Sequence, residues 1–431
     1  MFMFTRGRSF DGGRFLATPA PDSAAQPIRS IDAPATLRVP LAQADEPAAE
    51  PRVVTGQTVA ANDLLGESPG GAGRVHSPVS GTVSRLARVD TPYQQDVPAI
   101  EIAVAGAGAS EPSPGERTAD AADWPAVGEL LDRLGRLGVD LAESAWLWKV
   151  RRVDEIIISG LDCDPAQSAH LRTLTSYADE VVSTAAALHD VFGARRTWLV
   201  LDSARRRLLS ALAEVARGCP VRVHGVVSKY PQGMANLLVR TVAGAEVPCE
   251  ATPAAVAVWV TDACAMMDVF RAVVQEQACT WQTVTVAGDA VSSPGNYRVA
   301  PGSTIGSLVR HAGLAKTPRQ IIVGGVMNGI AVPTGDVVLT KRTRCVTVRC
   351  DGVRAPSEAM ACLRCGECQD VCPVGLDPRG LLELAERNRL ELAVRRHPQV
   401  CLDCGLCDYV CPSSLPLMRG VRRCREHVSV R

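Results

Sequence analysis

Eight cysteines in the C-terminal quarter of the chain have a spacing that could hold metal. They form two copies of the pattern C-x2-C-x2-C-x3-C-P, one ending at Pro373 and the other at Pro412. Three thiolates separated by two residues each can surround one face of an iron–sulfur cube, while the intervening backbone amides point at its sulfides. The fourth cysteine lies too far round to complete the same cube. We therefore predict that each run gives three ligands to one cluster and its fourth to the other.

This double run is typical of bacterial two-cluster ferredoxins. The predicted ligands of the first [4Fe-4S] cluster are Cys362, Cys365, Cys368 and Cys411, and those of the second are Cys401, Cys404, Cys407 and Cys372. The alternative is structural zinc or disulfides. Zinc motifs usually pair C-x2-C with a distant second pair, and disulfides are rare in a reducing compartment, so the clusters are favoured. The remaining cysteines have no ligand spacing. Except for Cys163, which lies in an acidic segment described below, they are predicted to be small buried apolar residues: 219, 249, 264, 279, 345, 350 and 424.

Composition bounds the class of protein. The chain has 431 residues, 46% of them apolar, which is enough for several packed domains. Its 46 basic and 46 acidic residues cancel, which argues against nucleic acid as a partner. Apolar stretches such as residues 321–332 are shorter than the ~20 residues of a membrane span, so no span is predicted. The N-terminal residues lack the apolar core of a signal peptide, which predicts a cytoplasmic protein with reduced cysteines.

Sequence patterns predict the elements that position these cysteines. Short strands between Gly and Pro turns over residues 37–86 predict a small β module. A strand at 197–201, a helix opened by Ser203 and a strand at 221–227 predict a βαβ unit with parallel strands. A strand, turn, strand and helix within 282–312 predict a small α+β module.

Between the two cysteine runs, Asp377 followed by Pro378 is a start signal for a helix. Leucines continue to residue 392, so we predict a helix over residues 379–396 that packs against the clusters and spaces them.

With its modules in this order, the chain resembles the RnfC family of the Rnf electron-transport complex over nearly its whole length. Four further segments carry the resemblance: residues 10–13 (FDGG), 75–83 (VHSPVSGTV), 230–233 (YPQG) and 324–329 (GGVMNG). Microcompartment cobalamin reductases share these modules but begin with the flavin domain, so the N-terminal β module favours the Rnf arrangement.

The resemblance implies a multidomain fold that combines α/β and α+β parts. The implied divisions are an N-terminal extension (1–35), a barrel-sandwich hybrid β domain (36–104), a linker (105–123), a Rossmann-like domain similar to the flavin subunit of complex I (124–280), a β-grasp ligand-binding domain (281–350) and a helical ferredoxin-type domain with two [4Fe-4S] clusters (351–431). No lysine lies in residues 77–83 of the β module, which excludes covalent lipoylation or biotinylation there.

The family's FMN and NADH site uses a loop of the form G-G-A-G-F-P-T followed by a lysine. Glycines in such a loop let backbone amides approach a phosphate. The corresponding stretch here, residues 138–149, keeps only Gly138 and Lys149, and it contains two carboxylates and two tryptophans. We therefore predict weak or absent NADH oxidation.

An acidic segment further along, residues 159–165 (SGLDCDP), resembles the family's N-G-A-E-C-E-P. The cofactor-binding residues that the resemblance implies are Gly138, Lys149, Gly160, Asp162 and Asp164, and no catalytic residue is assigned. In the alternative interpretation the loop has only drifted, and flavin binds through Asp162 and Asp164.

The function predicted from these residues is electron transfer through two [4Fe-4S] clusters to or from a redox partner protein. The resemblance implies membrane-bound Rnf-type subunits as partners and a peripheral location on the cytoplasmic face of the membrane. One alternative is an NADH-oxidising flavoprotein with FMN, either an active Rnf subunit or a cobalamin-reductase-like enzyme. Another is a non-redox scaffold whose clusters only hold the fold together.

Overall fold

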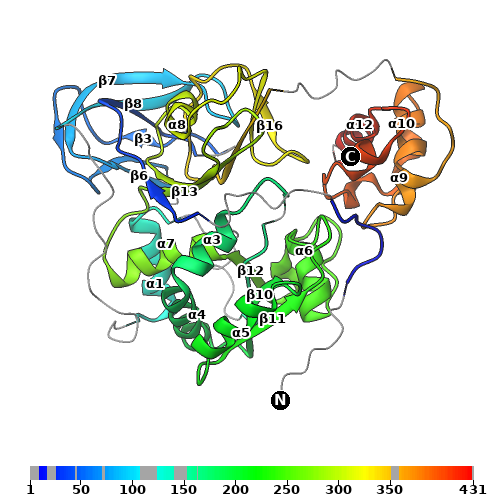
Figure 1. Cartoon of the computed structure of the whole chain (residues 1–431), viewed down its shortest axis with the longest axis horizontal. Coiled ribbons are helices and arrows are strands. Elements are labelled where there is room, and N and C mark those ends of the chain that lie inside the picture. Colours follow the sequence, from blue (N-terminus) through cyan, green and yellow to red (C-terminus); the bar gives the residue numbers. More distant parts are fainter. Residues whose placement is uncertain are drawn as a thin grey trace.

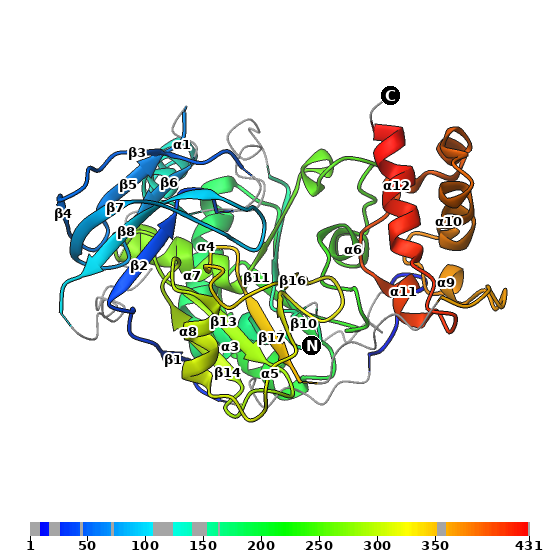
Figure 2. The same cartoon turned by 90° about the horizontal axis from the view of Figure 1, so that it is seen from above.

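The computed structural model describes residues 9–16, 26–43, 46–69, 73–106, 124–139, 153–162, 164–350 and 359–429. Four units make up this part of the chain, and the β module and the cysteine-rich helical unit lie at opposite ends of the molecule (Figure 1 and Figure 2). No helix within the described ranges is long and apolar enough to cross a membrane.

The first unit is the predicted β module. Its strands are β2 (Thr36–Pro40), β3 (Glu50–Pro51), β4 (Thr58–Val59), β5 (Leu64–Glu67), β6 (Arg74–His76), β7 (Gly81–Val89) and β8 (Val97–Val104). They form two antiparallel sheets, in the orders β2-β8-β7-β4 and β3-β5-β6. Apolar side chains of both sheets, including Leu37, Leu65 and Ile100, share one fully buried core.

One acidic side chain of this module gives a pH prediction. The Glu101 carboxylate, 10% exposed, lies 2.9 Å from the Nε atoms of both Arg85 and Arg38. The hydrogen bond from Arg85, aided by Arg38, lowers the pKa of Glu101 from 4.5 to about 2. The ionised Glu101 carboxylate therefore stabilises the fold above pH 4.5, and this stabilisation is lost as the pH falls toward 2.

We expect Glu101→Gln to lower the free energy of unfolding by about 1–3 kcal/mol at pH 6 and by clearly less at pH 3, as measured by urea unfolding. The control is Asp96→Asn, because the Asp96–Arg88 pair is 72% and 61% exposed and should contribute little at either pH. An equal loss at both pH values for Glu101→Gln would contradict the role given to the carboxylate.

The second unit contains a parallel sheet with helices on both faces. Its strands are β9 (Glu155–Ser159), β10 (Arg196–Asp202), β11 (Val221–Val226) and β12 (Val258–Asp262), in the order β11-β10-β9-β12. Its helical segments are α1 (Val127–Arg136), α3 (Ala169–Ser176), α4 (Ala178–Phe192), α5 (Arg206–Val215), α6 (Ala235–Leu238), the π-helix η3 (Val239–Ala243), the 3-10 helix η4 (Pro253–Val256) and α7 (Ala263–Val274). The predicted parallel βαβ unit is confirmed as β10-α5-β11, although α5 begins at Arg206, three residues after Ser203.

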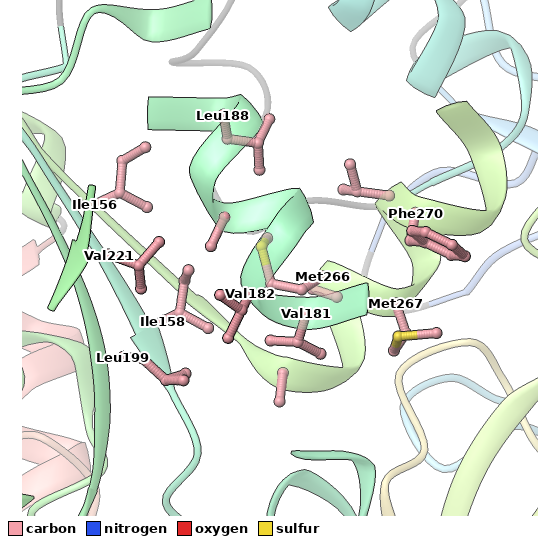
Figure 3. Packing of buried hydrophobic residues seen from close by; sticks show 14 of the residues in the cluster. Ile156, Ile158, Val181, Val182, Leu188, Leu199, Val221, Met266, Met267 and Phe270 are labelled. Atoms are coloured by element: carbon pink, nitrogen blue, oxygen red, sulfur yellow. The ribbon is translucent and has the colours of Figure 1, made fainter. Parts of the chain in front are cut away.

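Alternation along β9 explains the two buried faces of the sheet. Ile156 and Ile158 belong to the core beneath α4 and α7, whereas Ile157 belongs to the core on the opposite face. Figure 3 shows the first of these cores, where sheet residues face apolar side chains of the two helices. Because the chain returns past β9 to place β12 on its other side, the strand order reverses there and the carboxyl ends of β9 and β12 lie side by side.

The third unit is a mixed sheet with one helix. Its elements are β13 (Gln282–Ala287), β14 (Gly295–Val299), α8 (Ile305–Ala312), β15 (Gln320–Val323), β16 (Ile330–Val332) and β17 (Cys345–Arg349). The short strand β1 (Arg29–Ser30), from the segment predicted to be an extension, pairs in parallel with β14 and so joins this sheet. The resulting order is β1-β14-β13-β17-β15-β16.

The fourth unit holds the cysteine runs. It consists of α9 (Glu367–Asp370), α10 (Pro378–Glu386), the 3-10 helices η5 (Leu390–Arg396) and η6 (Pro398–Val400), α11 (Leu406–Val410) and α12 (Leu417–Ser429). The start of α10 is as predicted, since the Asp377 side chain accepts a hydrogen bond from the Gly380 amide at 2.8 Å. The single helix predicted over 379–396 is instead two, because the chain turns at Asn388, which has a φ of 52°.

Candidate metal centres

The two cysteine runs fold into matching local structures. The second residue after the first cysteine, Arg364 in one run and Asp403 in the other, has a positive φ of 56° or 53°. The glycine that follows the second cysteine, Gly366 or Gly405, is also left-handed, with φ values of 85° and 76°. A short helix, α9 or α11, then begins in each run. The repeated spacing therefore gives a repeated backbone path.

The eight thiols lie around two cavities. A cavity of about 190 Å³ is lined by Cys362, Cys365, Cys368 and Cys411. A second, tighter cavity is lined by Cys372, Cys401, Cys404 and Cys407. Each cavity thus takes three cysteines from one run and the fourth from the other, which is the grouping that the spacing predicts.

Backbone amides donate hydrogen bonds to the first and the fourth cysteine of each run. The Arg364 amide lies 3.4 Å from the Cys362 Sγ, and the Asp403 amide lies 3.4 Å from the Cys401 Sγ. The corresponding pairs at the fourth cysteines are the Leu376 amide with the Cys372 Sγ at 3.3 Å and the Leu415 amide with the Cys411 Sγ at 3.4 Å. Such donors stabilise thiolates and raise the reduction potential of a cluster.

The donor set and its surroundings suit iron–sulfur clusters. Four soft thiols around each cavity favour such a cluster over a hard cation. Burial raises the pKa of the Cys404 thiol to about 11 and also raises the pKa of Cys401 and Cys368. These thiols are therefore protonated without metal, and metal binding must release their protons.

The two cavities differ in exposure. The first is at the surface, where Cys365 is exposed and the neighbouring Leu363 and Met360 side chains are 67% and 57% exposed. At the second cavity, Cys404 and Cys407 are buried. We call the two positions the outer and the inner centre.

Two of the short segments used in the sequence analysis meet at the inner centre. Tyr230, of the YPQG segment, donates from its hydroxyl to the Cys404 carbonyl at 2.7 Å. Its backbone also pairs with Arg14, next to the FDGG segment. Figure 1 shows this N-terminal segment, in dark blue, running beside the helical unit.

The glycines of the FDGG segment allow this close approach. A Cβ on Gly12 would lie 2.7 Å from the Cys372 carbonyl oxygen, and the Gly13 amide donates to the Val371 carbonyl at 2.9 Å. Lys229 holds the segment by donating to the carbonyls of Phe10 and Gly12. The segment thus lies against the backbone of an inner cysteine and makes packing contacts there.

Asp164, an implied flavin ligand, fixes a loop of the third unit. Its carboxylate accepts from the Met327 amide at 2.8 Å and from the Ala166 amide at 3.0 Å. Met327 lies in the glycine-rich turn 324–329, and its carbonyl oxygen lies 2.6 Å from where a Cβ on Gly405 would be. The turn therefore links Asp164 of the parallel-sheet unit to the cysteine run of the inner centre.

The other implied flavin residues are also engaged in internal contacts. Both carboxylate oxygens of Asp162 accept from the first turn of α3, from the His170 amide at 3.0 Å and the Leu171 amide at 3.1 Å. Burial raises the pKa of Asp162. A Cβ on Gly160 would lie 2.1 Å from the Leu174 Cδ1, so this glycine serves helix packing.

Gly138 lies at the end of α1 with a φ of 64°, and its carbonyl accepts from the Lys341 Nζ at 2.8 Å. Lys149 lies outside the described residues, as do Trp146 and Trp148. Of the implied residues that the structure describes, only the amides of Gly138 and Gly160 could donate to a phosphate, and both donate instead to backbone carbonyls, those of Gly135 and Val200. Asp162 and Asp164 offer only acceptor oxygens, so these described residues do not fit an FMN phosphate.

Sequence reasoning missed one cluster of polar side chains in this unit. Cys264, predicted to be a buried apolar residue, lies beside His170 and Asp262. The available signal was the position of Asp262 directly after a buried strand, where side chains at a sheet edge converge.

Four family models match the chain in the order of these units. They describe the RnfC barrel sandwich hybrid domain (residues 8–107), the Nuo51 FMN-binding domain (142–271), the SLBB domain (283–331) and the 4Fe-4S dicluster domain (361–415). The last match confirms the prediction of two [4Fe-4S] clusters, and the order of the four confirms the predicted resemblance.

Similar curated proteins are named as the C subunit of the ion-translocating oxidoreductase complex. The protein of Yersinia pestis bv. Antiqua (strain Antiqua) is 28% identical over 86% of this chain and 62% of its own length. That of Pectobacterium carotovorum subsp. carotovorum (strain PC1) is 28% identical over 90% of this chain and 53% of its own length. The chain thus spans about three fifths or less of these relatives. A crystal structure of NAD+-reducing [NiFe]-hydrogenase in the air-oxidized state has a TM-score of 0.49 at 16% identity, over 72% of this chain and 63% of that one.

Proposed function

Because the chain is homologous to the RnfC component of ion-translocating oxidoreductase complexes, we propose that it is an iron–sulfur electron-transfer subunit, passing electrons to or from a redox partner protein. The observation that carries this proposal is the arrangement of eight thiols around two neighbouring cavities, one at the surface and one buried. Two centres in series, of which only one approaches the solvent, suit a relay between a buried and an exposed site.

We propose the following ligands. The outer cluster is bound by Cys362, Cys365, Cys368 and Cys411, and the inner cluster by Cys401, Cys404, Cys407 and Cys372. Cys368 and Cys372 line different cavities but are only four residues apart, and so are Cys407 and Cys411. Four residues span at most about 14 Å, which keeps the clusters close enough for electron transfer. The outer cluster, near exposed Leu363 and Met360, would exchange electrons with the partner.

The finer domain assignment is also a proposal. The parallel order β11-β10-β9-β12 supports a Rossmann-like domain over 124–280, and the two packed sheets support a barrel-sandwich domain over 36–104. The mixed sheet with α8 supports a β-grasp domain over 281–350, extended at its edge by β1 from within residues 1–35. Residues 105–123 are then a linker and 351–431 the cluster domain.

We propose other subunits of an ion-translocating complex as partners, because the relatives are named as subunits of one. The proposed location is peripheral, on the cytoplasmic face of the membrane, since thiolate ligands require a reducing compartment.

The alternative function is NADH oxidation through FMN, which the match to the Nuo51 FMN-binding domain favours. Against it stand the internal hydrogen bonds of Asp162 and Asp164 and the loss of glycines over residues 138–149. We therefore propose that electrons enter from a partner protein and that Gly138, Lys149, Gly160, Asp162 and Asp164 do not form a working flavin site.

The test is cofactor analysis and turnover of protein purified without oxygen. We expect about eight iron atoms per chain, little flavin, clusters that a chemical reductant bleaches, and NADH turnover far below about 1 per second with an artificial acceptor. One flavin per chain with turnover of about 1–1000 per second would establish the NADH-oxidising enzyme instead. Clusters that no reductant bleaches would support the scaffold hypothesis.

A further inference from the structure

A group of three different metal-binding side chains lies away from the cysteine runs. His170 is in the first turn of α3, Asp262 ends β12 and caps α7, and Cys264 is in the first turn of α7. These elements meet at the carboxyl ends of β9 and β12, where the strand order of the sheet reverses. The point at which the strand order reverses is the usual ligand position in an open parallel sheet.

The distances within the group suit one small ion. The His170 Nδ1 lies 3.2 Å from the Asp262 Oδ1, and one ligand atom from each of the three residues lies within 4.8 Å of the others. The ligands of tetrahedral zinc, bound at about 2.0–2.3 Å, lie roughly 3.3–3.8 Å from one another. Modest side-chain adjustment would bring the three atoms to that spacing.

The His170 ring already points at the other members of the group. Its side chain is only 12% exposed, and its Nδ1 forms an ion pair with the Asp262 Oδ1 at 3.2 Å. Metal coordination would replace this ion pair, since a neutral imidazole nitrogen and a carboxylate oxygen are both zinc ligands. The Cys264 thiol, also buried, lies 3.3 Å from the Thr173 hydroxyl, which orients it as a ligand.

Charge and access are consistent with a divalent ion. A thiolate and the Asp262 carboxylate bring two negative charges. The nearby Arg344 pairs with Asp268 at 3.6 Å, and its positive charge also helps to lower the pKa of Asp262. The Asp262 side chain is 34% exposed, so one side of the group is open to solvent. Solvent can therefore reach the Asp262 carboxylate.

We propose that His170, Asp262 and Cys264 bind one divalent transition-metal ion with the preferences of zinc, with water as the fourth ligand. Binding releases to solvent the proton of the Cys264 thiol and the Nδ1 proton that His170 carries in its ion pair with Asp262. The site is separate from the cavities of both clusters.

The probe is Co²⁺, added without oxygen to the full, cluster-loaded chain after removal of loosely bound metal. We expect one Co²⁺ per chain at unchanged iron content, with the visible bands of tetrahedral, thiolate-bound Co²⁺ in the difference spectrum. Cys264→Ser should remove the thiolate bands, and Cys264→Ser and Asp262→Asn should each weaken binding at least about tenfold. Asp262→Asn retains helix capping, because asparagine caps as well as aspartate.

Cys279→Ser is the matched control, since Cys279 is a buried thiol outside this group. It should leave the Co²⁺ spectrum and affinity unchanged. No bound Co²⁺, or bands that persist in Cys264→Ser, would overturn the proposal and leave His170 and Asp262 as an ion pair that caps α7. Because iron content is measured in the same samples, this failure is distinct from a failure to bind clusters.

Discussion

Replacing Cys372 by serine is expected to damage the inner cluster, whose other ligands belong to the second run, more than the outer cluster beside its own run. The Cys372 thiol lines the cavity of Cys401, Cys404 and Cys407, while Cys411 lines that of the first run. Cys372→Ser and Cys411→Ser should therefore each lose about four of about eight iron atoms, but from different clusters.

Double variants identify the cluster that is lost. Cys372→Ser combined with Cys401→Ser should lose no more iron than Cys372→Ser alone, because both residues bind the inner cluster. Cys372→Ser combined with Cys362→Ser should lose nearly all the iron. Iron content and the electron paramagnetic resonance of the reduced protein measure both outcomes. If Cys372→Ser with Cys362→Ser instead loses no more iron than Cys372→Ser alone, and Cys372→Ser with Cys401→Ser loses nearly all of it, each run supplies all four ligands of its own cluster.

Local sequence rules predicted the parts of the molecule that local chemistry determines. The cysteine grouping follows from spacing, the start of α10 from Asp377, and the parallel βαβ unit from a strand, a helix and a strand in succession. The break at Asn388 was missed because leucines continue beyond it, and only the backbone turn to a positive φ ends α10 there.

Contacts between distant segments could not be predicted in the same way. The bond from Tyr230 to the Cys404 carbonyl joins residues 174 positions apart, and that from Met327 to Asp164 joins residues 163 apart. The sequence shows that these segments resemble a family, but not that they pack around one centre. The resemblance therefore implies a flavin contact for Asp164 but does not reveal that its carboxylate holds a loop.

The importance of this loop contact can be tested by comparing two glycines. Gly405 and Gly366 occupy equivalent left-handed positions, so alanine at either strains the backbone by about 1–2 kcal/mol. Only at Gly405 would the new Cβ meet a second unit, at 2.6 Å from the Met327 carbonyl oxygen; at Gly366 the nearest atom is the Asp370 Oδ2, 3.9 Å away. Gly405→Ala should therefore displace the turn 324–329, whereas Gly366→Ala should not.

Hydrogen exchange at the Met327 amide measures this displacement, since that amide donates to the buried Asp164 carboxylate. We expect Gly405→Ala to speed its exchange about tenfold or more, equivalent to about 1.4 kcal/mol, and Gly366→Ala to leave it unchanged. Asp164→Ala should speed the same exchange without touching the cysteine run, because it removes the acceptor itself. If the two glycine variants give equal exchange rates, the turn 324–329 does not pack against the cysteine run of the inner centre. If they differ as expected, Asp164 positions the cluster domain through the Met327 turn.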